Sequence, residues 1–135
     1  MERFIFSCLF MKRKLITAVR NNDTAQVAEL LLQGVTPNCR DHSTPLQLAV
    51  RQGNAEMTKM LLSHGANPNT RSLMGHTALE FAMTSNHAEL LMLELVSLLL
   101  AHGADPARDA TFSSHVDLAK RTGSAELFKM LSLSV

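Results

Sequence analysis

Apolar residues recur along most of the chain at the three- and four-residue spacing of helices, in segments too short for long helices. Three of these segments end in a glycine that is followed three residues later by a proline: Gly34 and Pro37, Gly65 and Pro68, Gly103 and Pro106. Glycine readily takes the left-handed conformation that closes a helix, and proline prevents the helix from resuming. The pattern therefore predicts short helices joined by extended connections, in an all-α fold.

Polar residues mark the helix starts just as regularly. A Ser or Thr followed three residues later by Gln, Glu or Asp favours a capping box, and this pattern begins at Thr44, Thr77 and Ser114. Second helices are predicted to follow the capping residues Asp23, Asn54 and Ser124. Each unit is thus predicted to contain two short helices.

The units repeat along the chain. Equivalent alanines stand 31, 33 and 37 residues apart, at Ala18, Ala49, Ala82 and Ala119. Repeats of this length cannot bury their apolar faces alone and must stack on one another. The core of such a stack is predicted to include Leu46, Leu48, Ala49, Met60, Leu61 and Leu62.

The repeated segments resemble the ankyrin repeat, which is 33 residues long and has the signature T-P-L-H-x-A. Residues 44–49 read Thr-Pro-Leu-Gln-Leu-Ala, and residues 60–69 read Met-Leu-Leu-Ser-His-Gly-Ala-Asn-Pro-Asn. The resemblance covers about residues 13–135 and divides them into units 13–43, 44–76, 77–113 and 114–135. It implies a solenoid of stacked helix-turn-helix units joined by β-hairpin-like loops.

Two units depart from the repeat pattern. The third carries extra residues at 87–93, which are strong helix formers and are predicted either to lengthen its helices or to form a helical loop between them. The fourth reads Ser-His-Val-Asp where Thr-Pro-Leu-His is usual.

Residues 1–12 form an apolar N-terminal extension that contains Phe4, Phe6 and Phe10. Its positive charges, Lys12 to Lys14, follow the apolar run, whereas a signal peptide carries them before it. We expect a leading helix or arm that packs on the first repeat. A targeting role, and a translation start at Met11, stay open.

Composition narrows the class of protein. The 135 residues carry 13 Lys and Arg against 12 Asp and Glu, and 46% are apolar. This balance is too apolar for a disordered chain and too close to neutral for a protein that coats nucleic acid. Two cysteines suit free thiols in a reducing compartment, so we expect a cytoplasmic protein, with secretion as an effector into a host cell left open.

The sequence offers no recognisable catalytic or metal-binding pattern. It lacks H-E-x-x-H, paired C-x-x-C, G-x-S-x-G and a phosphate-binding glycine loop. Among the six histidines, His64 and His102 directly precede glycines that end helices, where a histidine complements the helix dipole. We therefore expect a non-enzymatic protein without cofactor or metal.

Candidate binding residues come from repeated columns and from the longest loop. The ankyrin resemblance implies that the inner helices end at the concave groove with Arg20, Arg51, Thr84, Ser85 and Arg121. The arginines form a predicted basic ladder for an acidic segment of a partner protein. The loop of the second unit adds Leu73 and Met74, interpreted either as an apolar anchor for the partner or as residues partly buried against a neighbouring loop, and His76 flanks them.

The resulting prediction is a protein–protein interaction module that acts as adaptor, inhibitor or effector. The alternative is a small regulatory subunit or effector with a composite enzymatic or nucleic-acid-binding role that the sequence does not display. No nucleic acid or membrane partner is expected, and we expect a monomer, with self-association left open by the exposed apolar residues.

Overall fold

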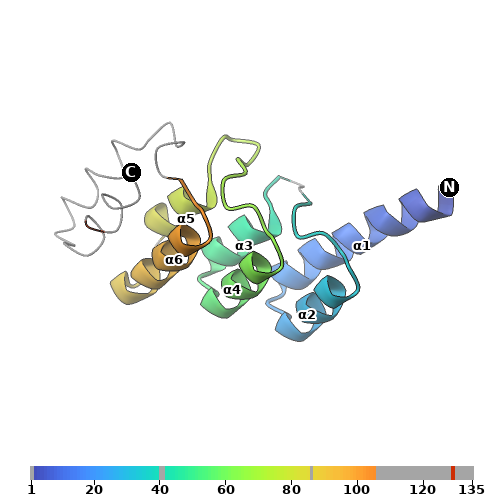
Figure 1. The fold of residues 1–135 in the computed structure, drawn as a ribbon, viewed down its shortest axis with the longest axis horizontal. Helices are drawn as coiled ribbons and strands as arrows, with labels where there is room; N and C mark the ends of the chain where they lie inside the picture. Colours follow the sequence, from blue (N-terminus) through green and yellow to red (C-terminus); the bar gives the residue numbers. More distant parts are fainter. Residues whose placement is uncertain (1, 40–41, 86, 106–128, 130–135) are drawn as a thin grey trace.

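The computed structural model describes residues 2–39, 42–85, 87–105 and 129, with side chains from residue 9 onward except that of residue 89. In these ranges the chain forms helices and no strand: α1 (Glu2–Arg20), α2 (Thr24–Leu32), α3 (Pro45–Gln52), α4 (Ala55–Ser63), α5 (Ala78–Thr84) and α6 (Glu89–Ala101). Figure 1 shows successive helix pairs stacked side by side, with α1, α3 and α5 in one layer and α2, α4 and α6 in the other. This is the all-α solenoid expected from the repeats.

Side chains cap the helix starts as predicted. The Thr44 hydroxyl accepts from the Gln47 amide at 3.2 Å, and the Gln47 side-chain oxygen accepts from the Thr44 amide at 3.0 Å. Thr77 accepts from the amide of Glu80 in the same way. Asp23 and Asn54 cap α2 and α4. The predicted caps at Ser114 and Ser124 lie outside the described residues.

The helix ends also follow the prediction. The glycines after α2, α4 and α6 have φ between 89° and 95°: Gly34, Gly65 and Gly103. The Nδ1 atoms of His64 and His102 each lie 2.9 Å from the carbonyl oxygen four residues earlier. Because a carbonyl only accepts, Nδ1 carries the proton, and it adds a second bond to a carbonyl that also accepts from the main-chain amide of the same histidine at 3.2 Å. The capping role of both histidines is confirmed.

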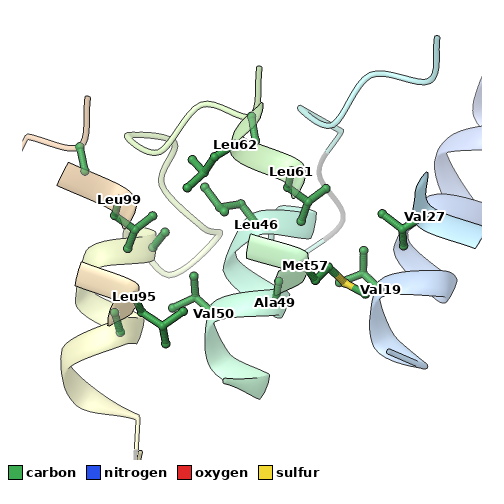
Figure 2. Close-up of a cluster of buried hydrophobic side chains, with 14 of the residues drawn as sticks. Val19, Val27, Leu46, Ala49, Val50, Met57, Leu61, Leu62, Leu95 and Leu99 are labelled. Carbon is green, nitrogen blue, oxygen red and sulfur yellow. The ribbon is translucent and has the colours of Figure 1, made fainter. Parts of the chain in front are cut away.

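The core lies between the two helix layers and runs from repeat to repeat (Figure 2). Ala18, Ala49 and Ala82 are fully buried, and their small side chains let α3 pack on α1 and α5. Met57, Leu61 and Leu95 fill the space on the outer-helix side. Of the predicted core residues, Leu48 and Met60 are only half-buried and pack against the outside of the core cluster.

Each of the first two loops contains one asparagine that bonds to the main chain of the following repeat. The Asn38 amide donates to the Gly65 carbonyl at 3.1 Å, and its oxygen accepts from the Asn67 amide at 2.7 Å. Asn69 repeats the arrangement one unit later, with the Gly103 carbonyl at 2.9 Å and the Asp105 amide at 2.8 Å. These bonds hold successive loops at a fixed spacing.

Two helices are longer than their counterparts. The extra residues of the third unit extend α6 to 13 residues, against 9 in both α2 and α4, whereas α5 has 7 residues against 8 in α3. The predicted lengthening is thus confirmed for the second helix of the unit, and no separate helix forms between α5 and α6 in the described residues. At the other end, α1 runs from residue 2 to residue 20 without a break at residues 12–13. None of the helices in the described part of the chain is long and apolar enough to cross a membrane.

Candidate protein-binding surface

The loop of residues 70–76 carries two exposed apolar side chains at its tip. Leu73 is 65% exposed and Met74 is 83% exposed. Main-chain bonds fold the loop tightly: the Ser72 amide donates to the His76 carbonyl at 2.7 Å, and the Gly75 amide to the Ser72 carbonyl at 2.9 Å. The reading of Leu73 and Met74 as partly buried against a neighbouring loop is therefore wrong.

The base of this loop is anchored from a buried side chain. The side-chain nitrogen of Gln47, which also completes the cap of α3, donates to the carbonyls of Thr70 at 2.7 Å and His76 at 3.2 Å. The Leu73 amide donates to the His42 carbonyl of the preceding loop at 3.1 Å. The tip is consequently held in one position before any partner arrives.

His76 connects the loop to α5. Its Nδ1 lies 2.5 Å from a carboxylate oxygen of buried Glu80, and its ring meets the edge of Phe81 at 5.7 Å between centroids. The imidazole side chain is still half exposed. His76 thus forms part of the surface and also fixes the orientation of the first turn of α5.

Arg51 lies on the neighbouring inner helix and meets the same aromatic ring. The carbon of its guanidinium stands 5.3 Å from the centroid of Phe81, within the range of a cation–π contact. Arg51, His76 and Phe81 therefore form one surface cluster that links α3, the 70–76 loop and α5. Phe81 was not singled out from the sequence, but its position carried a signal. It directly precedes the repeated alanine Ala82, just as half-buried Leu48 directly precedes Ala49 in the second unit.

The remaining predicted residues lie along the inner helices with different local roles. Arg20 is exposed at the end of α1, and its carbonyl accepts from the Gln52 side chain at 3.0 Å. The Thr84 hydroxyl donates to the Glu80 carbonyl of its own helix at 2.7 Å. Ser85 is the half-buried C-cap of α5. Arg121 lies outside the described residues.

Titratable groups show no catalytic or metal-binding arrangement within the described residues. No group of three or more His, Cys, Asp or Glu in that part of the chain is placed to hold a metal ion. Cys39 is a free, buried thiol, and burial raises its pKa above the ordinary value. A thiol with a raised pKa is a poor nucleophile, because the thiolate is the reactive form.

Comparison with known proteins agrees with this architecture. A family model described as ankyrin repeats (3 copies) matches residues 15–110. The chain belongs to the ankyrin repeat family. A solved ankyrin repeat domain from Acinetobacter baumannii superimposes with a TM-score of 0.78 at 24% identity, covering 89% of this chain and 63% of that one. The solenoid fold expected from the sequence is thereby confirmed.

The curated relatives match this chain over only a small part of their own length. Human ankyrin repeat and SOCS box protein 14 is 36% identical over 97 residues, which are 72% of this chain and 16% of the relative. Zygote-specific protein 3 of Chlamydomonas reinhardtii is 40% identical over 65 residues, 47% of this chain and 18% of that protein. The matched parts span less than a fifth of each relative. Ankyrin repeats are in general protein–protein interaction modules.

Proposed function

We propose that this ankyrin repeat protein is a non-enzymatic module that binds a partner protein through its concave groove and loop tips. The observation that carries the proposal is the exposure of Leu73 and Met74 on a loop held in place by hydrogen bonds. Fully burying one such side chain contributes about 1.5–3 kcal/mol. Because the main chain of the loop is already ordered, little of that gain is lost to ordering the loop on binding.

The proposed surface extends from the 70–76 loop along the ends of the inner helices. It includes Arg20, Arg51, Leu73, Met74, His76, Thr84, Ser85 and Arg121, and Phe81 now joins this set. In the described part of the set the formal charges are positive, which favours a partner with an acidic segment. Adaptor, inhibitor and effector are the roles that such a module would fill.

Partner capture with matched variants tests the proposal. Tagged wild-type chain, Leu73→Ser/Met74→Ser and Leu32→Ser are incubated with lysate of the source cell, and retained proteins are quantified by mass spectrometry. Leu32 is the control because it is 81% exposed on the outer helix α2, away from the loop tips. We expect a stoichiometric partner that the Leu32 variant keeps and the loop variant loses. Equal retention by all three chains would contradict the proposed surface.

A further inference from the structure

An open cleft of about 630 Å³ lies between α1 and the first loop, residues 35–39. The described residues that line it are Leu9, Lys12, Arg13, Ile16, Thr17, Arg20, Asn38 and Cys39. Apart from Arg20, the binding surface proposed above includes none of these residues. Three of them are cationic, and none of the described lining residues is acidic.

The spacing of these residues on α1 explains why they share the cleft. Positions three and four apart lie on the same face of a helix, so residues 9, 12, 13, 16, 17 and 20 form one continuous stripe. Leu15 and Val19 lie outside this stripe and are fully buried in the core. Packing of the core therefore fixes the rotation of α1 and aims the stripe at the cleft.

The cleft combines an apolar floor with cations. Ile16 and Cys39 are buried, while Leu9 is 54% exposed and offers apolar surface at one end. Lys12 is half-buried and lies near enough to Cys39 for its charge to oppose the rise in the thiol pKa that burial causes. Arg13 and Arg20 are exposed. A ligand in the cleft would meet positive charge beside apolar surface.

The opposite wall is fixed by the next repeat. The side chain of Asn38 is bonded to both the Gly65 carbonyl and the Asn67 amide, so the loop that carries Asn38 and Cys39 is tied to the second unit. The cleft is thus bounded by a packed helix and an anchored loop. A ligand needs to order little of either wall.

We propose that this cleft binds an acidic peptide segment of the partner protein. An apolar side chain of the segment packs on Leu9 and Ile16, and flanking carboxylates pair with Lys12 and Arg13. The inference rests on the proposed function and specifies which chemistry the partner presents to the first repeat. A single-stranded nucleic acid is the less favoured occupant, because the described lining residues include no aromatic side chain on which bases stack.

Selection from a random peptide display library tests this chemistry without knowledge of the partner. The full chain, Arg13→Glu and Lys59→Glu are the baits. Lys59→Glu makes the same change of net charge at an exposed site on the outer helix α4. We expect wild type and Lys59→Glu to enrich peptides with several Asp or Glu residues around an apolar residue. Arg13→Glu is expected to lose that enrichment, and the selected peptide is expected to bind it about tenfold more weakly, a difference of about 1.4 kcal/mol.

Two further measurements locate the peptide and test the fold. Amide chemical shifts of the full chain should change at residues 12–20 and 38–39 when the selected peptide is added. The urea midpoint of Arg13→Glu should equal that of wild type, because Arg13 is exposed. Shift changes confined to other parts of the chain would overturn the assignment of the cleft.

Three further results would overturn the inference. The first is the absence of acidic enrichment in the wild-type selection, and the second is enrichment that Arg13→Glu retains. The third is a single-stranded DNA oligonucleotide that binds more tightly than the selected peptide and depends on Arg13. The proposed function fails by a different route, namely retention of the partner by Leu73→Ser/Met74→Ser. If that variant loses the partner but the library selection yields no acidic peptides, binding through the loop tip is supported and the acidic segment in the cleft is refuted.

Discussion

Asn69 offers a sharp test of how one repeat holds the next. Its side chain lies in the second unit, and both of its polar atoms bond to the main chain after α6, 34 and 36 residues further along. The bonds measure 2.9 Å to the Gly103 carbonyl and 2.8 Å to the Asp105 amide. The substitution Asn69→Ala removes both bonds and adds no bulk, so it isolates this contact.

The expected cost follows from the surroundings of the bonds. A hydrogen bond within a protein contributes about 1 kcal/mol net, and an unsatisfied buried group costs more. Gly103 is exposed and Asp105 is half-buried, so water replaces part of what is lost. We therefore expect Asn69→Ala to lower the free energy of unfolding by about 1.5 kcal/mol, which lies between the net contributions of one and of two hydrogen bonds.

Urea unfolding followed by circular dichroism measures this change. Asn38→Ala removes the same pair of bonds one repeat earlier and should cost a similar amount. Asn21→Ala is the matched control, an exposed asparagine at the end of α1. Hydrogen exchange supplies a local readout, because the Asp105 amide should lose protection in Asn69→Ala. A change below about 0.5 kcal/mol, typical of a surface substitution, with an unaltered Asp105 amide, would refute the reasoning.

Three other substitutions or conditions test the packing and the thiol. Gly53→Ala should destabilise the chain by about 1–3 kcal/mol, because φ is 74° there and a new Cβ would lie 3.0 Å from His87 Cε1. Thermal unfolding measures this loss of stability, and an unchanged Tm would contradict the prediction. Leu95→Ala should cost about 2–5 kcal/mol in urea unfolding, since Leu95 is fully buried, and a cost near zero would contradict the packing. The raised pKa of Cys39 predicts stability that is full below pH 9.0 and falls as pH rises through that value, because the unfolded thiol releases its proton first. Cys39→Ala should lose this part of the pH dependence, and identical pH profiles of the two chains would refute it.

Local signals in the sequence determined much of the fold. The capping threonine Thr44, its partner Gln47 and the glycine at Gly65 act within a few residues, so their roles could be read from spacing alone. The lengthening of α6 followed equally from helix propensity at residues 87–93. Ala18, Ala49 and Ala82 were recognised because they recur in register, and each is buried.

Contacts between repeats could not be read in the same way. The stacking of Arg51 on Phe81 depends on how far α5 is displaced from α3, and no local rule sets that displacement. Asn69 carries no signal that its partners lie more than 30 residues away. The cleft beside α1 arises because a basic stripe and a loop from the same unit face each other, which neither segment shows alone.

Site-specific photo-crosslinking in the source cell tests the central claim most directly. A photoreactive amino acid replaces Met74 at the loop tip or, as the control, Leu32 on α2, two positions that are about equally exposed. We predict that position 74 crosslinks to one protein in stoichiometric amount, whereas position 32 does not. Equal crosslinking from both positions, or capture of that protein from position 32 alone, would contradict binding through the loop tip.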